Sequence, residues 1–211
     1  MLNSSLKTIR LEGFGEQLRQ LGASADRIAA QTINAGAEYA HEIGRSAMLD
    51  EIAFPTGYID SSGRFFVSKR ATTKNLEARI SARDRATSLA RFVVGNPQPY
   101  KRGGVRVRVK RKGTATPMRG AWLTGVNSGN RGLAVRVARG GTIPGRRRGV
   151  AGLPKLRSDK SGNSYLLYGP SVNQAFKGVG DDIKPKVSEF MAKDFSRRFQ
   201  AAIRSSARGS K

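Results

Sequence analysis

The chain of 211 residues carries 39 Lys and Arg against 15 Asp and Glu, a net charge of +24. The length suits one medium-sized domain with a real core, although a hydrophobic fraction of 38% and 25 glycines indicate that part of the chain is extended or ordered by a partner. The absence of cysteine excludes disulfides and thiolate metal sites, and no apolar run reaches the roughly 18–20 residues of a membrane span.

The charge is distributed unevenly. Residues 1–60 carry five cations and eight acids, a net charge of −3, so residues 61–211 hold +27. An excess of this size indicates nucleic acid or an acidic assembly surface as the partner. The first residues lack the apolar core of a signal peptide, so we expect synthesis and use in the cytosol or in a particle assembled there.

The predicted organisation is a single α+β domain over residues 1–211, with an extended N-terminal arm at 1–22. A long helix follows, since small and branched apolar residues recur at helical spacing from Ala25 to Ile52. Ser24 is its expected N-cap, and Pro55 lies beyond its end. The small residues predict close packing against another helix or a sheet.

The middle of the chain shows the two-residue alternation of β-strands. Residues 64–70 fit either a short helix or a strand. Strands are predicted at 76–83, 91–94, 105–110, 121–126, 133–137 and 165–168. Together they predict a twisted antiparallel sheet of about four or five strands, in which Asn127-Ser128-Gly129-Asn130 turns a hairpin.

The most basic of these strands lies within Lys101–Lys112, with the sequence KRGGVRVRVKRK. Its valines alternate with Arg106, Arg108 and Lys110, so the valines can enter a core while the cations line the opposite face. Arg136, on a neighbouring strand, is predicted to extend the same cationic face.

A long loop rich in Gly, Pro and Arg follows at 139–164. A loop of this length is usually functional, or disordered until bound. Its triple arginine, Arg146-Arg147-Arg148, fits duplex DNA or another polyanion, an acidic neighbouring protein, or plain solvent exposure.

The last element is an amphipathic helix at about Lys184–Ser205 with Pro185 at its first position. Asp181 and Asp182 precede it and favour its N-terminus, while Asp194 falls on a polar face. Packing of its apolar stripe onto the sheet is preferred to a membrane or cofactor role, and the stripe consists of Val187, Phe190, Met191, Phe195, Phe199 and Ile203.

The candidate functional residues are cations, which position a phosphate backbone without reading bases. The predicted polyanion contacts are Lys101, Arg102, Arg106, Arg108, Lys110, Arg111, Lys112, Arg136, Arg139, Arg146, Arg147 and Arg148. Trp122 is expected in the core, not as a base-stacking platform.

No catalytic constellation accompanies these cations. The single histidine, His41, lies inside the long helix without a recognised metal or acid–base spacing, and is interpreted as a surface or packed residue. No phosphate-binding loop or Ser–His–acid pattern is present. We therefore expect a non-enzyme without metal or cofactor.

Several segments in the same order resemble the phage minor tail protein Z family, the tail-completion proteins of long-tailed, lambda-like phages and related prophages. The similarity runs over most of residues 20–205. It is carried by the long small-residue helix, FPTGYIDSSGRFFVSKRATTKNLEARISAR at 54–83, SLARF at 88–92, the basic strand, MRGAWLTGV at 118–126, YGPSVNQAF at 168–176 and the C-terminal helix. KRAT at 69–72, LEARI at 76–80 and GPS at 169–171 are the most similar local segments, whereas 139–164 is poorly constrained by the family pattern.

The resemblance implies a structural virion protein at the head–tail junction that helps to join tail to head, assembled in the host cytoplasm. Its expected partners are tail terminator, tail tube and head–tail connector rings, other copies in a closed ring, and the end of the double-stranded DNA genome, with no membrane. The alternative is a non-sequence-specific RNA- or DNA-binding protein, against which stand the mildly acidic long helix and the lack of known RNA- or DNA-binding patterns. A small-molecule enzyme lacks any site residues.

Overall fold

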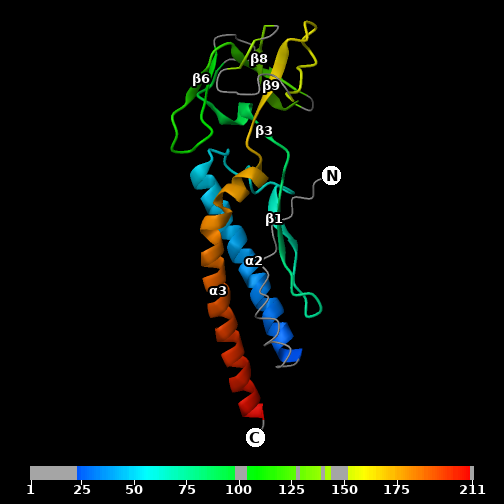
Figure 1. Ribbon diagram of the computed structural model, residues 1–211, viewed down its shortest axis with the longest axis vertical. Helices are drawn as coiled ribbons and strands as arrows, with labels where there is room; N and C mark the ends of the chain where they lie inside the picture. Colours follow the sequence, from blue (N-terminus) through cyan, green and yellow to red (C-terminus); the bar gives the residue numbers. More distant parts are fainter. Residues whose placement is uncertain (1–22, 98–103, 127–128, 139–140, 144–151, 210–211) are drawn as a thin grey trace. The chain divides into compact units, whose positions relative to one another are not determined.

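The computed structural model describes residues 23–97, 104–126, 129–138, 141–143 and 152–209. Two helices and a set of antiparallel sheets confirm the α+β prediction (Figure 1). The chain divides into two compact units. Unit 1 comprises Met1–Met48, Ile59–Asp84 and Asn173–Lys211, and unit 2 comprises Leu49–Tyr58 and Arg85–Val172. Whether the protein behaves as a single domain stays a prediction, and the predicted arm at 1–22 lies outside the described residues.

Unit 1 is built on two antiparallel helices, α2 (Ala23–Glu51) and α3 (Val172–Gly209). α2 approaches α3 closely at two glycines, because a Cβ added at Gly36 would lie 2.6 Å from Met191 Cγ, and one at Gly44 would lie 2.6 Å from the ring of Phe176. Stacking of Tyr39 on Phe190 adds a contact at 4.5 Å between ring centroids. The expectation that small residues mark a close packing partner of α2 is therefore confirmed, and that partner is a helix.

The prediction for the C-terminal helix was wrong in its start and missed α2 as a packing partner. α3 begins at Val172, and Pro185, Asp181 and Asp182 lie inside it. The apolar stripe starts well before Pro185, since Val172, Ala175, Phe176, Val179 and Ile183 are all buried. That buried stripe runs across the proline and packs on α2, where Phe176 and Ile183 face Gly44, and Phe176 also contacts the ring of Phe65.

Three further expectations about the helices need correction. Ile203 is 54% exposed, so the apolar stripe does not stay buried to its last member. Asp194 is buried instead of lying on a polar face, and accepts hydrogen bonds from Arg197 and Arg198 at 2.5 Å each. Burial alone would raise the pKa of Asp194, but the bonds from Arg198 and Arg197 outweigh it and lower that pKa. α2 includes Ser24 as its second residue, so Ser24 is not its N-cap.

A two-stranded hairpin completes unit 1. β1 (Phe65–Lys69) pairs antiparallel with β2 (Arg79–Ala82), which decides the open choice at 64–70 in favour of a strand and shortens the strand predicted at 76–83. Phe65 is buried, stacks on His41 at 4.5 Å and contacts the ring of Phe176 at 4.8 Å between centroids.

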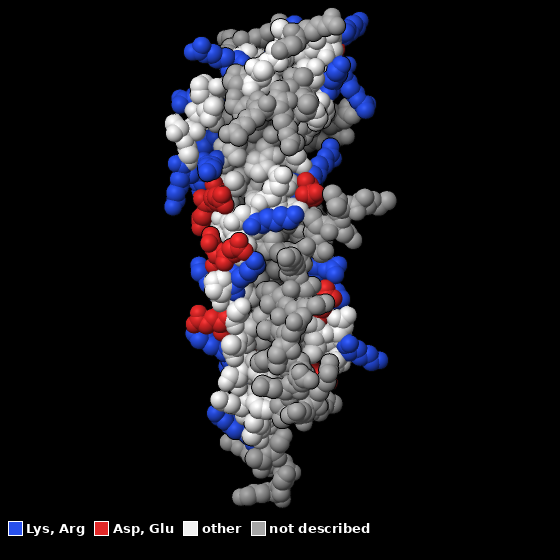
Figure 2. Space-filling model, in the orientation of Figure 1, with Lys and Arg blue, Asp and Glu red and all other residues white. Residues whose placement is uncertain are grey.

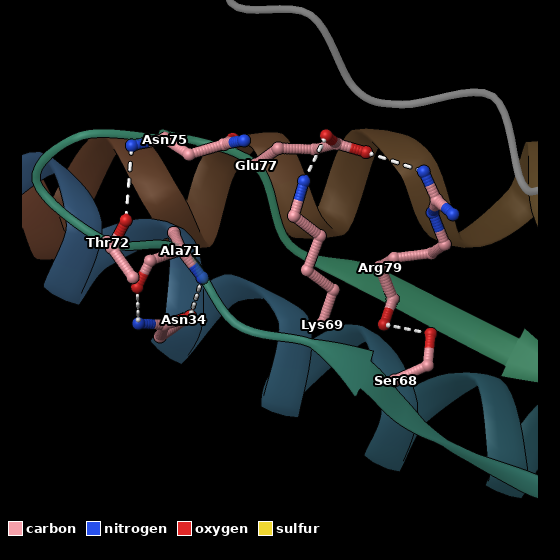
Figure 3. A network of polar contacts seen from close by, with 8 residues as sticks. All are labelled: Asn34, Ser68, Lys69, Ala71, Thr72, Asn75, Glu77 and Arg79. Carbon is pink, nitrogen blue, oxygen red and sulfur yellow. Dashed lines mark hydrogen bonds and ion pairs between the residues drawn. The ribbon is translucent and has the colours of Figure 1, made fainter.

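Polar contacts fix the hairpin and its loop to α2 (Figure 3). The Asn34 side chain pairs with the backbone of Ala71 in both directions: Nδ2 donates to the carbonyl oxygen at 2.9 Å, and Oδ1 accepts the N–H at 2.7 Å. Within the hairpin, Glu77 accepts from Lys69 at 2.7 Å and from Arg79 at 3.1 Å, which lowers the pKa of Glu77. The Asn34 side chain thus gives the Ala71 backbone the hydrogen-bond partners that a neighbouring strand would otherwise supply.

The described residues of unit 2 form two antiparallel sheets. The larger has the order β3-β9-β8-β7, formed by β3 (Thr87–Ser88), β9 (Ser164–Gly169), β8 (Arg131–Arg136) and β7 (Ala121–Gly125). The smaller has the order β4-β5-β6, formed by β4 (Val93–Val94), β5 (Val105–Val107) and β6 (Thr116–Met118), and a 3₁₀ turn at Leu89–Phe92 precedes β4.

This topology corrects the prediction that the basic strand and the 121–137 hairpin share one sheet. β5 pairs with β4 and β6, whereas β7 and β8 pair with each other and β8 with β9. The start of the predicted strand at 91–94 is 3₁₀ instead.

The core of unit 2 includes Trp122, as expected, packed with Ala134 and Leu156. Leu156 and Ile143 belong to the predicted loop at 139–164, so the described parts of that loop contribute to the core and are not wholly solvent-exposed.

Candidate polyanion-binding surface

The positive charge concentrates in unit 2. Unit 2 has 19 Lys and Arg against three acids, a net charge of +16, whereas unit 1 has 20 against 12, a net charge of +8. Residues 85–158 contain no Asp or Glu at all. Such a one-signed segment repels itself and attracts polyanions.

The described cations of unit 2 lie on its surface, and two of them, Arg111 and Arg136, also make contacts within the unit. All 13 Lys and Arg of unit 2 that the structure describes are exposed. Among those described residues a single ion pair occurs, between Arg136 and Asp159. Figure 2 shows Lys and Arg side chains projecting from the part of the molecule that carries β6, β8 and β9 in Figure 1.

The smaller sheet places Arg106 and Arg108 on the surface by strand alternation. Val105 and Val107 are buried, and the residues between and after them are exposed. The alternation continues for a few residues beyond β5, because the Arg108 N–H donates to the Phe92 carbonyl at 2.8 Å and Ala53 N–H donates to the Val109 carbonyl at 2.8 Å. The predicted cationic face of Arg106, Arg108 and Lys110 is therefore exposed as expected.

A glycine sets the entry to this strand. Gly104 has φ +83°, and a Cβ there would lie 3.1 Å from the Met118 carbonyl and 3.3 Å from Arg119 Cα. Only glycine satisfies both the left-handed backbone and this close approach without strain. The turn predicted from Gly103-Gly104 thus has a structural reason at Gly104, while Gly103 lies outside the described residues.

Arg111 differs from the other predicted contacts because it has a structural task. Its N–H donates to the Glu51 carbonyl at 2.8 Å, and its Nε donates to the Leu49 carbonyl at 2.5 Å. The last carbonyls of a helix lack intrahelical donors, and a cation there also complements the helix dipole. Arg111 therefore caps the C-terminal end of α2.

Arg136 is also engaged within the unit, and it does not extend the face of β5 because the two strands lie in different sheets. Its guanidinium lies 3.5 Å from Asp159, whose side chain is 9% exposed. Asp159 Oδ1 also accepts the N–H and the hydroxyl of Ser161, at 3.1 and 2.7 Å. The neighbouring hydroxyls of Ser164 and Ser161 hold the pKa of Asp159 at about 2, with Arg136 as a smaller contribution. Only the Ser161 hydroxyl forms a hydrogen bond, since Ser164 Oγ has no hydrogen-bond partner among the described residues.

The remaining predicted contacts divide into two groups. Lys112 is exposed in the turn that follows β5. Lys101, Arg102, Arg139, Arg146, Arg147 and Arg148 lie outside the described residues.

Sequence reasoning missed the residues beside Arg106 and several exposed cations elsewhere in unit 2. β6 was not predicted, because three residues with a central Pro117 give no alternation to detect. The register places Pro117 and Val94 opposite Arg106, on the same face of the sheet. Arg119, Arg157 and Lys160 are exposed cations that were also not singled out.

Metal binding needs a cluster of ligating side chains. No group of three or more His, Cys, Asp or Glu able to hold a metal ion occurs among the described residues. His41 is half-buried, stacks on Phe65 and lies 3.2 Å from its carbonyl oxygen. No helix in the described residues combines the length and the apolar character needed to cross a membrane.

Compared with models of protein families, with curated proteins and with solved structures, the chain matches none.

Proposed function

We propose that the protein is a structural, non-catalytic virion component of a tailed phage, acting in tail completion at the head–tail junction. In this role unit 2 contacts the end of the packaged genome or acidic proteins of neighbouring rings, and copies of the chain form a closed ring. The observation that carries the proposal is the exposed, strongly cationic surface of unit 2, with net charge +16.

The family resemblance and the exposed positive charge involve the same residues. The segments that resemble the phage minor tail protein Z family include the basic strand, and that strand exposes Arg106, Arg108 and Lys110. Repeating one such surface around a ring would multiply its charge, which suits a polyanion held at an axis.

The second candidate function is non-sequence-specific binding of RNA or DNA outside any virion. The same exposed cations favour it, because backbone contacts by Lys and Arg need no base recognition. The two functions differ in where the protein resides.

Cryo-electron microscopy of particles from a phage that encodes the chain separates the two candidates. A ring at the head–tail joint is the expected result. Finding the chain outside particles and bound to RNA would contradict the virion role and favour the second candidate.

A charge reversal tests the surface itself. The triple variant Arg106→Glu, Arg108→Glu, Lys110→Glu is expected to fold, because all three side chains are exposed, and to block the production of infectious particles. Arg111 is left unchanged because its loss would also uncap α2. Particle titres equal to those of the unaltered phage would contradict the proposal.

A further inference from the structure

The outer face of the sheet β4–β5–β6 has a definite composition. Arg106 on β5 lies opposite Val94 on β4 and Pro117 on β6, and directly opposed residues of antiparallel strands share a face. Val94 is 39% exposed, and the other two are exposed as well. The shorter side chains on either side leave the guanidinium of Arg106 open to an approaching surface.

Arg108 adds a second cation further along the same strand. It follows Arg106 by two residues and is exposed, so the two Cα atoms lie about 6.7 Å apart along an extended chain. This spacing is of the order of that between successive phosphates on one strand of nucleic acid. No Asp or Glu occurs anywhere from residue 85 to 158, so no acid competes for either guanidinium from the strands of this sheet.

We propose that this outer face binds the sugar–phosphate backbone of duplex DNA, with Arg106 and Arg108 as its phosphate ligands. The inference rests on the proposed function, and it selects the DNA genome over acidic ring proteins as the partner of unit 2. Arginine suits the role because its planar fork matches two phosphate oxygens at once.

Single-stranded nucleic acid fits this face less well. Proteins that hold single strands stack bases on exposed aromatic rings. Every aromatic residue of unit 2 that the structure describes is buried or half-buried, including Trp122, Tyr165 and Tyr168.

An acidic protein also fits less well. Stable protein interfaces centre on a desolvated cluster of large apolar or aromatic side chains. Within the described residues of unit 2, Val94 is the only large hydrophobic residue that is exposed. A rigid row of phosphates needs no such cluster.

The test measures how salt affects binding of the full chain to a fluorescent 30-base-pair duplex of mixed sequence. The double variant Arg106→Gln, Arg108→Gln should reduce the slope of log Kobs against log salt by about 1.8, since each phosphate contact contributes about 0.9. Between 50 and 200 mM salt the unaltered chain should therefore lose about twelvefold more affinity than the variant.

Matched variants control for charge and for folding. Arg157→Gln, Lys160→Gln removes the same number of exposed cations from a loop of unit 2 and should leave the slope nearly unchanged. Arg106→Lys, Arg108→Lys keeps both charges and should restore most of the slope. Val94→Glu places an acid beside Arg106 on the same face and should weaken duplex binding, whereas Val94→Thr should not.

Three outcomes would overturn the inference: an equal loss of slope in the loop variant, tighter binding of single strands than of duplex, or displacement of the duplex by polyglutamate at equal charge concentration. Each leaves the virion role standing if particles still contain the chain. Conversely, a chain that binds duplex through this face but is absent from particles contradicts the virion role alone.

Discussion

Asp159 is the only acidic residue between Arg85 and Val172. Its carboxylate is largely shielded from solvent and receives two hydrogen bonds from Ser161, while Arg136 lies 3.5 Å away. The Asp159 carbonyl also accepts the Gly162 N–H at 3.0 Å, so the residue closes the turn that leads into β9. The single acid of this basic segment thus organises local backbone structure.

Asp159 should make stability depend on pH in the acid range. Its pKa of about 2 in the folded protein lies below the ordinary value of about 3.9, so its contribution to stability is complete above about pH 4. That contribution should be lost as the pH falls through 2, because the folded state must then take up a proton at the carboxylate.

The free energy of unfolding, measured from pH 6 to pH 2 for the unaltered chain and for Asp159→Asn, checks this prediction. We expect the variant to be less stable at pH 6 and the difference between the two to shrink toward pH 2. A difference that stays constant across this range would contradict a role for the charged carboxylate.

Single residues also mark where sequence reasoning reaches its limit. The alternation of Val105 and Val107 with Arg106 and Arg108 is a local property, and it correctly predicted which side chains are exposed. The burial of Asp194 is not local, because its helix position became buried only through the packing of α3 within unit 1. Pairing across elements decides such positions.

At the scale of elements, α2 and α3 are fitted to each other through Gly36 and Gly44. The two glycines meet different neighbours: a flexible Met191 side chain faces Gly36, whereas the rigid ring of Phe176, 2% exposed, faces Gly44. A rigid neighbour within a buried contact cannot yield as a thioether chain can.

Gly44→Ala should therefore destabilise unit 1 more than Gly36→Ala does. Overpacking costs about 1–3 kcal/mol, and the better helix propensity of alanine offsets about 1 kcal/mol of it, so we expect Gly44→Ala to lower the free energy of unfolding by up to about 2 kcal/mol. Urea denaturation of both variants measures the difference.

Gly180→Ala is the matched control for this comparison. Gly180 lies inside α3, and a Cβ there would meet nothing within 4 Å. This variant should gain about 1 kcal/mol from helix propensity alone. If Gly44→Ala stabilised the protein as much as Gly180→Ala, the close approach of the two helices would be contradicted.

The elements themselves were predictable where their pattern was long. Periodicity and turn residues correctly predicted α2 and the hairpin of β7 and β8. The start of α3 was predicted wrongly, because a proline such as Pro185 normally marks a helix start. Its apolar stripe crosses the proline, and long-range packing outweighs the one missing N–H. The division into two sheets was not predictable either, since β4 and β6 are too short to show a period.

At the scale of the whole molecule, repulsion among cations opposes compactness. Unit 2 concentrates +16 in 98 residues, and its described part contains one ion pair. The Debye length falls from about 30 Å at 0.01 M salt to about 8 Å at 0.15 M, which screens most of this repulsion.

Stability of the free protein should accordingly rise with ionic strength over this range. Urea denaturation at 0.01 and 0.15 M NaCl, at one pH, measures the effect, with sucrose at matched osmolality as the uncharged control. A fall in stability with added salt would mean that attractive pairs dominate the electrostatics, contrary to the charge distribution.

The pairing of Asn34 with Ala71 has a consequence for hydrogen exchange. The Ala71 amide lies in a hairpin loop, where exchange with deuterium is usually fast, yet its hydrogen is held by a side chain of α2 that is 37 positions away in sequence. Its exchange rate therefore reports separation of the hairpin from the helix, and not fraying of the hairpin alone. Slow exchange at the Ala71 amide would therefore measure how often the hairpin separates from α2. In the variant Asn34→Ala, the exchange rate of this amide should rise to that of an ordinary loop.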